Sequence, residues 1–394
     1  MLLYSCARLL AVHVSNADET IERVLGCFYL SDDISLTSAA FQHLMEGPAL
    51  NPAAANDIFH ELLERDPASA DRWCDMGAIL AHTGQIEKGK YCFLRAAQLA
   101  PNSPQISMSI ANSYFIVGQA RSALPYFSRI LHGVPEYDST AFDYFDAMKL
   151  DFNEIVAYGG LPAESRPAQS YFRHLLATGD LEQVRKAWTW VRSHSFSDDR
   201  LASEYVNFLS ARGLAEEAAT TWASQVGGRE NGYLKQTIVF NGDFEREPSG
   251  AVLDWRITPS DHVEVIRDEQ VAYSGKWSLR ISFDGKENMN YQGVSQRVFV
   301  RPGTYRFEAF VRTAEITTDQ GIALRVSDAE ADRLEIETEG MTGTGEWRRL
   351  EKKLVVARPA RLMEIQVIRH ASLKFDSLIA GTAWIDKVSL ARMD

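Results

Sequence analysis

The sequence predicts an α + β protein of several domains, in which an N-terminal α-helical solenoid precedes a C-terminal antiparallel β-sandwich. Two observations support this prediction. Before about residue 230, small and apolar residues recur every 34 positions, a period typical of helix–turn–helix repeats. After Ile238, apolar residues alternate with a period of two between turn sequences, which is typical of short β-strands. A chain of 394 residues is long enough for both parts.

The period of 34 residues is clearest between residues 70 and 135. One repeat, starting at Ala70, contains Trp73, Gly77, Gly84, Phe93, Ala96 and Pro101, and the next contains Ala111, Tyr114, Gly118, Ala123, Phe127 and Pro135. This spacing resembles the tetratricopeptide repeat, whose helix pairs bury their apolar faces only against one another. We expect each turn glycine to adopt a left-handed conformation that ends one helix. The large residue near the middle of the second helix should pack opposite a small residue of the first.

The same period sets the predicted domain boundaries. A weaker helix pair should begin near Leu36, and Gly179 and Gly213 mark two later turns. We expect an N-terminal helical segment over 1–34, repeats over 35–230 with an irregular stretch at 137–167, a linker at 231–237 and the β-domain over 238–394.

Strand-like runs and turn sequences define the β-domain. The predicted strands are Ser278–Phe283, Val294–Val300, Tyr305–Arg312, Ile322–Val326, Arg349–Val356 and Leu362–Ile368. Six further sequence elements occur in order, namely Asn241–Glu245, Trp255, Ser274–Arg280, Gln296–Tyr305, Glu346–Arg348 and Ala383–Leu390. Together they resemble the galactose-binding-like jelly roll of many carbohydrate-binding modules. Repeats followed by such a module also resemble bacterial envelope proteins of exopolysaccharide pathways, which implies a periplasmic or membrane-anchored location.

The resemblance to carbohydrate-binding modules implies a structural calcium ion that joins the first strand to the last. The matching residues are Asp243 or Glu245, the carbonyl of Lys276, and Asp386. Carboxylate and carbonyl oxygens are the ligands that calcium prefers. Alternatively, Asp243 caps a turn and Asp386 pairs with an arginine. No other cofactor is implied.

A sugar ligand needs an aromatic face for stacking and planar polar groups for its hydroxyls. The candidate residues are Trp255, Tyr291, Gln292, Arg312, Arg325 and Arg369. Strand alternation should direct Arg312 and Arg325 away from the core. Trp277 and Trp384 lie beside apolar strand residues, and we expect them to pack in the core. The alternative for the exposed arginines is simple solvation.

The repeats predict a protein-binding groove. The first helix of each repeat should line a concave face, where our candidates are Met108, Asn112, Phe115, Arg173 and Asn207. Met108 and Phe115 would hold an apolar segment whose backbone Asn112 could bind. The alternative is that these side chains contact a neighbouring helix or only water.

Composition narrows the classes of function. The net charge of −12 argues against a nucleic-acid-binding protein, which needs a basic surface. The four cysteines, Cys6, Cys27, Cys74 and Cys92, have no metal-ligand spacing. We expect buried free thiols, and the alternative is a Cys74–Cys92 disulfide.

The first residues carry little signal. Residues 1–14 form an apolar run interrupted by Arg8, which is shorter than the roughly 20 residues of a membrane span. We interpret the run as the end of a helix, a remnant of an anchor whose beginning is missing. The alternative is a true cytosolic start.

No catalytic motif is present, so we expect a protein that is not an enzyme. A glycosidase requires two acids that flank one bond, for which Glu308 and Glu364 are the candidates, but the sequence does not place them together. We therefore expect a binding and scaffold protein, with repeats that recruit a protein and a jelly roll that binds a glycan. The alternative is an assembly factor whose jelly roll only caps the last repeat.

Overall fold

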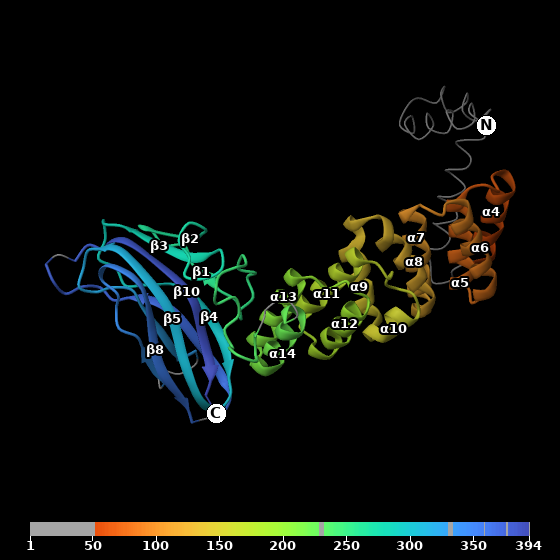
Figure 1. Cartoon of the computed structure of the whole chain (residues 1–394). Helices are drawn as coiled ribbons and strands as arrows, with labels where there is room; N and C mark the ends of the chain where they lie inside the picture. The colour runs from red at the N-terminus through yellow and green to blue at the C-terminus, as the bar shows by residue number, and fades with distance from the viewer. Residues whose placement is uncertain (1–51, 228–231, 330–333, 358, 376, 394) are drawn as a thin grey trace, which may run out of the picture. The chain divides into compact units, whose positions relative to one another are not determined.

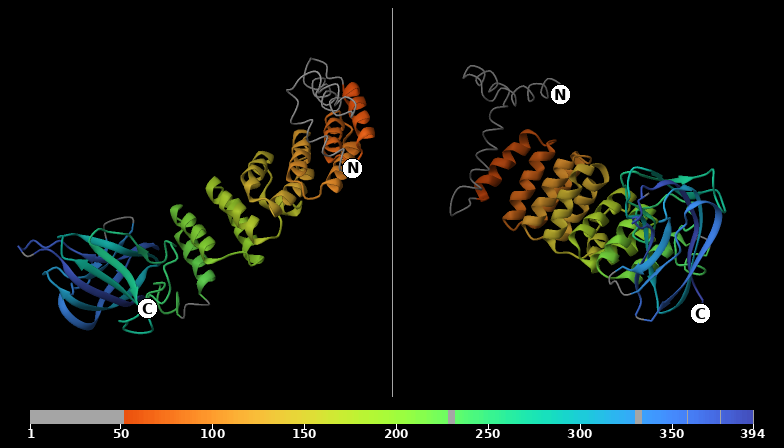
Figure 2. Two further views of the ribbon diagram at one scale, coloured as in Figure 1. Left: turned by 90° about the horizontal axis from the view of Figure 1, so that it is seen from above. Right: turned by 90° about the vertical axis from the view of Figure 1, so that its left-hand side faces the viewer.

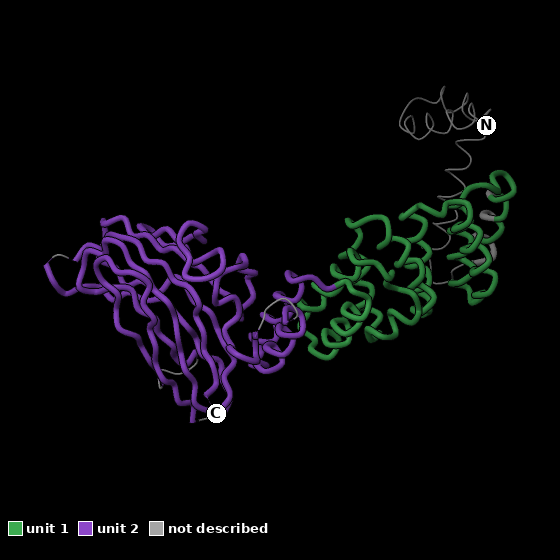
Figure 3. Tube along the Cα trace, viewed as in Figure 1, with its two compact units in different colours: residues 1–196 green, residues 197–394 purple. Residues whose placement is uncertain are grey.

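A computed structural model describes residues 52–227, 232–329, 334–357, 359–375 and 377–393 (Figure 1). The chain divides into two compact units, residues 1–196 and 197–394 (Figure 3). The predicted segment 1–34 and the helix expected from Leu36 lie outside the described residues. Within the part that the structure describes, no helix is long and apolar enough to cross a membrane.

The described part of unit 1, residues 52–196, consists of helices, several of which form antiparallel pairs (Figure 2). Their bounds are α4 (Pro52–Arg65), α5 (Ala70–His82), α6 (Ile86–Leu99), α7 (Pro104–Ile116), α8 (Ala120–Gly133), η1 (Pro135–Tyr137), α9 (Asp138–Met148), α10 (Phe152–Ala157), α11 (Ser165–Thr178) and α12 (Leu181–Ser193). The first helices of two successive pairs, α5 and α7, start at Ala70 and Pro104. This offset of 34 residues agrees with the predicted period.

The small and large residues of the repeat have the predicted structural roles. Gly84 and Gly118 have φ values of 83° and 73°, so they provide the left-handed turn that ends the first helix of each pair. A Cβ atom on Gly77 would lie 2.6 Å from the ring of Phe93. Glycine at this position therefore allows α5 and α6 to approach each other around a fully buried aromatic ring.

The predicted irregular stretch contains η1, α9 and the short helix α10. Asp151 caps the start of α10 with a capping box. Its side chain accepts from the N–H of Glu154, and the Glu154 side chain accepts from the N–H of Asp151. Phe142, Phe145 and Tyr171 pack against one another between α9 and α11 in tilted and edge-on arrangements, with ring centroids 4.9 to 6.2 Å apart. Aromatic packing thus joins the helices where the period of 34 residues is lost.

Unit 2 is a two-sheet antiparallel β-sandwich preceded by the helix pair α13 (Asp199–Ala211) and α14 (Ala215–Val226). Its strands are β1 (Arg256–Ile257), β2 (Val263–Asp268), β3 (Ser278–Asp284), β4 (Tyr291–Val300), β5 (Gly303–Ile316), β6 (Ala323–Asp328), β7 (Glu335–Glu337), β8 (Gly343–Val356), β9 (Arg361–Arg369) and β10 (Ala380–Arg392). One sheet has the order β1-β4-β9-β6-β7, and the other has the order β2-β3-β10-β5-β8. The strands β3, β4, β5, β6, β8 and β9 overlap the six predicted runs.

Alternating apolar residues of both sheets form the core of the sandwich. The helix pair α13–α14 belongs to this unit and not to unit 1, so the boundary lies earlier than the sequence predicts. The physical reason is direct packing. The indole of Trp222 on α14 is fully buried and meets the ring of Phe240 edge-on, with centroids 5.2 Å apart.

The described cysteines are both free and buried, which confirms the preferred prediction for Cys74 and Cys92. Burial is the main cause that raises the pKa of the Cys74 thiol to about 12, and the nearby Asp75 and Asp71 raise it further. Burial also raises the pKa of Cys92 to about 11. Both thiols therefore stay protonated at neutral and mildly alkaline pH.

We expect these two thiols to resist alkylation in the folded protein. A variant with Cys6→Ser and Cys27→Ser leaves only Cys74 and Cys92 to react. At mildly alkaline pH, their alkylation in native protein should be about a hundredfold slower or more than in urea, because a thiolate is the reactive form. Mass spectrometry of quenched samples measures the rate, and similar rates in both conditions would contradict the burial of these side chains.

Candidate functional site

A row of polar side chains crosses the outer face of the sheet β1-β4-β9-β6-β7. The strand register places one residue of each strand in line, because Arg256 is opposite Ser295, Ser295 opposite Gln366, Gln366 opposite Arg325 and Arg325 opposite Glu337. We call these five residues the polar row. Neighbouring strands lie about 4.8 Å apart, so the row spans about 19 Å.

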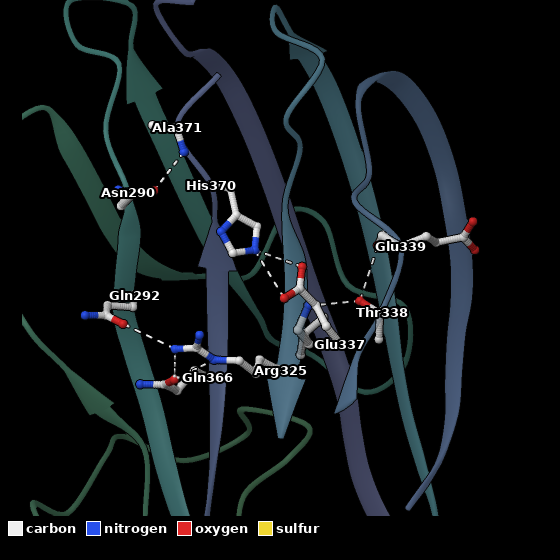
Figure 4. Close-up of polar contacts among 10 residues, drawn as sticks. Asn290, Gln292, Arg325, Glu337, Thr338, Glu339, Gln366, His370 and Ala371 are labelled. Atoms are coloured by element: carbon white, nitrogen blue, oxygen red, sulfur yellow. Dashed lines mark hydrogen bonds and ion pairs between the residues drawn. The ribbon is translucent and has the colours of Figure 1, made fainter. Parts of the chain in front are cut away.

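Hydrogen bonds hold the middle of the polar row (Figure 4). The Arg325 guanidinium donates to Oε1 of Gln366, at 3.1 Å from Nε and 2.5 Å from Nη2. It also donates to Oε1 of Gln292 at 3.3 Å. Beside it, Nε2 of His370 lies 3.0 Å from Oε1 of Glu337. Neither glutamine donates its amide N–H groups to any residue that the structure describes.

A pocket of about 650 Å³ lies at the β1 end of the same face. Its lining includes Arg256 and Ser295 of the polar row, the neighbouring Arg297 and Glu364, and Ser210 of α13. Apolar atoms come from Ala211, Pro248, Val252 and Ile257. The pocket therefore combines charged and hydroxyl groups with apolar lining residues.

Asn207 of α13 fixes the loop that forms one wall of this pocket. Its Nδ2 donates to the carbonyl of Gly250 at 3.2 Å, and its Oδ1 accepts from the N–H of Val252 at 2.7 Å. The carbonyl of Val252 in turn accepts from the N–H of Arg297 on β4. A chain of hydrogen bonds thus connects the helix to the edge of the sheet.

Two of the predicted glycan-binding residues, Gln292 and Arg325, are brought together on this face. Three others are corrected, because their side chains are buried. Trp255 is 1% exposed, packs on Phe244 and donates its indole N–H to the carbonyl of Asn241. Tyr291 is 3% exposed and meets Phe283 in the core. The Trp255 ring borders the pocket described above but is almost wholly covered, and the Tyr291 ring lies in the core.

Arg369, the third corrected residue, is 1% exposed and supports the loops at one end of the sandwich. Its guanidinium donates to Oδ1 of Asn288 at 2.9 Å and to the carbonyl of Met289 at 2.5 Å. It also donates to Oγ1 of Thr318 at 3.3 Å and to the carbonyl of Ser377 at 3.1 Å. Its role is therefore structural.

The sequence analysis did not identify Arg256, Ser295, Gln366 or Glu337. Each lies on a strand between two core residues or at its end, so alternation alone places each on an outer face. These residues come together because strands that are far apart in sequence, such as β4 and β9, are paired in the sheet. Sequence alternation does not specify that pairing.

Arg312 lies on the outer face of the other sheet, with its guanidinium 5.8 Å from the ring of Trp384. The neighbours of Trp384, Ala383 and Ile385, are fully buried, so Trp384 points outward. The prediction that Trp384 packs in the core was wrong. Trp277 is half-buried beneath the guanidinium of Arg267, which lies 4.3 Å from its ring.

The residues predicted to bind calcium have other partners in the structure. Oε1 of Glu245 accepts from the N–H groups of Lys276 and Trp277 at 2.6 and 2.9 Å. Oδ2 of Asp386 accepts from Tyr273 and Ser274 at 2.9 and 3.0 Å. Burial raises the pKa of Asp386 to about 6. The nearby Asp243 also raises this pKa, whereas the hydrogen bonds from Tyr273 and Ser274 lower it.

Among the described residues, no three acidic, histidine or cysteine side chains converge on a point that could hold a metal ion. The described contacts therefore do not by themselves form the predicted calcium site. Calcium binding at Asp243, Glu245, Lys276 and Asp386 stays a prediction.

Two predicted groove residues of the repeats, Asn112 and Phe115, lie at a contact between helices α7 and α9. The Tyr144 hydroxyl donates to Oδ1 of Asn112 at 2.9 Å, and the ring of Phe115 meets that of Tyr144 edge-on at 5.2 Å. Met108 and Arg173 are both half-buried. These contacts agree with the alternative that Asn112 and Phe115 face a neighbouring helix. Asn207 uses both polar atoms of its side chain to hold the loop described above.

No protein-family model matches the chain. No curated protein matches it either. Among solved structures, it is similar to a family 61 carbohydrate-binding module in complex with β-1,4-galactotriose, at 22% identity and a TM-score of 0.30, over 40% of this chain and 99% of that one. It is also similar to a family 22 module of Xyn10B from Clostridium thermocellum, at 18% identity and a TM-score of 0.29, over 41% and 95% of the two chains. The similarity concerns the fold and says nothing about the ligand of this chain.

We expect Arg369→Met to destabilise the sandwich, because it leaves several buried carbonyl and hydroxyl groups without a donor. Each such group costs about 1–3 kcal/mol, so we expect a loss on the order of 3 kcal/mol in the free energy of unfolding. Urea denaturation followed by tryptophan fluorescence measures it. The exposed Arg306→Met is the matched control and should change stability by about 0.5 kcal/mol or less. Equal effects of the two variants would contradict the anchoring role.

If calcium binds as predicted, about 1 mM CaCl2 should raise the melting temperature, and a chelator should reverse the rise. The variant Asp386→Asn should lose the response, because it removes a charged ligand. Magnesium at the same concentration is the control for ionic strength. An identical melting temperature with calcium and with chelator would exclude a structural calcium ion at this site.

Proposed function

We propose that this protein is a non-catalytic binding protein whose β-sandwich binds a glycan along the polar row. The observation that carries the proposal is the alignment of Arg256, Ser295, Gln366, Arg325 and Glu337, one from each strand of a single sheet. A row of about 19 Å provides hydrogen-bonding groups for several consecutive sugar residues. Sugar hydroxyls are both donors and acceptors, and this row presents both kinds of partner.

The hydrogen bonds within the row support a rigid binding surface. Gln366 and Gln292 are both oriented by the guanidinium of Arg325, which leaves their amide N–H groups available to a ligand. Glu337 is held by His370 in the same way. Side chains that are ordered before binding lose less conformational entropy when the ligand arrives, so affinity is higher.

The pocket at the β1 end supports the same ligand class. Its apolar lining residues Pro248, Val252 and Ile257 can contact the C–H face of a pyranose ring. Arg256 and Glu364 can then meet the hydroxyls of that ring. The described face has no exposed tryptophan or tyrosine. We therefore expect hydrogen bonds to contribute more to affinity than stacking does.

The placement of carboxylates supports a non-catalytic role. Glu308 lies on β5 and points out of one sheet, since its neighbours Phe307 and Ala309 are fully buried. Glu364 lies on β9 and points out of the other sheet, between the buried Met363 and Ile365. Two acids on opposite outer faces cannot flank the same glycosidic bond.

The resemblance of the helices to tetratricopeptide repeats leads us to propose that they recruit a protein partner. The envelope location likewise rests on resemblance, and both stay predictions. A second candidate function is an assembly factor whose sandwich caps the helices. The packing of Trp222 on Phe240 and the ion pair of Arg301 with Glu216 at 2.6 Å favour it, because the sandwich covers the pair α13–α14 directly.

We expect Arg325→Ala to weaken glycan binding about tenfold or more, because it removes one charged donor and frees the two glutamines that it orients. Calorimetric titration of the full chain with a panel of soluble polysaccharides measures the affinity. Arg95→Ala removes an exposed arginine of helix α6, outside the sandwich, and should bind as the wild type does. If the wild type binds no member of the panel, the cap function is favoured and the glycan proposal fails.

A further inference from the structure

The outer face of the sheet β2-β3-β10-β5-β8 carries a cluster of aromatic side chains that the proposed function does not use. The ring of Tyr273 lies parallel to that of Phe310 with centroids 3.8 Å apart, and it meets Trp347 of β8 at 5.8 Å. Trp384 of β10 lies on the same face. We call Tyr273, Phe310, Trp347 and Trp384 the aromatic cluster.

Side-chain alternation shows that the aromatic cluster faces outward. Phe310 lies between Ala309 and Val311, which are fully buried in the core. Trp384 likewise lies between two fully buried residues, and Tyr273 is 43% exposed. Four aromatic side chains on one outer face do not contribute to the hydrophobic core, so their position needs another explanation.

A buried carboxylate fixes the position of Tyr273. The loop between β2 and β3 folds over the sheet, and Asp386 of β10 accepts the N–H groups of Tyr273 and Ser274. Asp386 is fully buried under this loop. Trp384 is held too, because its indole N–H donates to Oδ2 of Asp268 at 2.8 Å. The rings are therefore ordered before any ligand binds.

Paired charges lie between and beside the rings. Arg312 of β5 lies opposite Trp384 in the register, and its guanidinium is 3.6 Å from Oε1 of Glu346. Arg280 of β3 flanks Trp384 on the other side and pairs with Glu264 at 3.0 Å. Donors and acceptors thus flank Trp384 on both sides.

We infer that the aromatic cluster is a second glycan-binding surface. A pyranose has an apolar face of C–H groups and a rim of hydroxyls, and this face of the sandwich offers rings flanked by guanidinium and carboxylate groups. A protein interface would instead favour a continuous apolar centre with charges at the rim. The charges here are paired, which suits a neutral sugar more than a charged one.

The spacing of the strands suits an extended chain. Trp384 and Trp347 lie on β10 and β8, with β5 between them, so their strands are about 9.6 Å apart. That separation is close to the length of a disaccharide. A β-linked chain that runs across the strands can place one ring against Trp384 and another against Trp347 and Tyr273.

This second surface does not depend on the polar row, since the two lie on opposite outer faces of the sandwich. If both surfaces bind, one molecule links two polysaccharide chains. Linking raises the apparent affinity for a polymer above that for a short oligosaccharide, because the second contact becomes intramolecular.

Two double variants of the full chain separate the surfaces, with soluble xylan, β-1,4-galactan and mixed-linkage β-glucan as probes. One variant is Tyr273→Ala with Trp347→Ala, and the other is Arg325→Ala with Gln366→Ala. We expect each to bind the same polysaccharide about tenfold more weakly than the wild type. Only the wild type should cross-link the polymer, which turbidity measures. The variant Tyr273→Phe with Trp347→Phe keeps the rings and should restore binding.

Each outcome decides between the two sites. Complete loss of binding in the Arg325→Ala, Gln366→Ala variant would overturn the second surface and support the first. Complete loss in the aromatic variant alone would support the second and overturn the first, and no binding by the wild type would overturn both. If the aromatic variant fails to fold, acrylamide quenching of tryptophan fluorescence in the polar-row variant replaces it. Protection from quenching by the polysaccharide supports the second surface, and unchanged quenching overturns it.

Discussion

The register of the antiparallel strand pairs is the constraint on which the rest of unit 2 depends. A shift of β9 by one residue against β4 and β6 would turn Gln366 into the core and Ile365 or Val367 into solvent. Because Met363, Ile365 and Val367 are fully buried, the hydrophobic core strongly disfavours such a shift. The alignment of polar residues on the outer face is therefore a consequence of packing on the inner one. The same argument fixes Trp384 and Arg312 on the opposite sheet.

Three arginines that the sequence presented as equivalent have three different environments. Arg325 is half-buried and orients two glutamines, Arg312 lies beside a tryptophan on the other sheet, and Arg369 is buried beneath loops. Alternation predicted the outward direction of the first two. Arg369 lies at the end of β9, where the chain leaves the sheet, so alternation no longer indicates which side is solvent. Its hydrogen-bond partners come from loops that are 8 to 81 residues away in sequence.

The sequence was informative wherever a physical requirement is local. A left-handed turn needs glycine, so Gly84 and Gly118 could be placed correctly, and a close approach of two helices needs a small residue such as Gly77. The strands followed from alternation in the same way. The boundary between the units could not be predicted, because the packing of Trp222 on Phe240 joins two segments that look separate in sequence. The polar row and the aromatic cluster were missed for a related reason, since each depends on which strands become neighbours.

The position of β8 at the edge of its sheet has a further consequence. This strand is 14 residues long and pairs along only one side, with β5. An exposed edge of that length presents unpaired N–H and C=O groups that could recruit a strand from another molecule. Arg348, Arg349, Lys352 and Lys353 follow one another along it and are all exposed. Arg348 and Arg349 are paired with glutamates, so Lys352 and Lys353 are the charges on this edge that oppose the approach of a second copy of it.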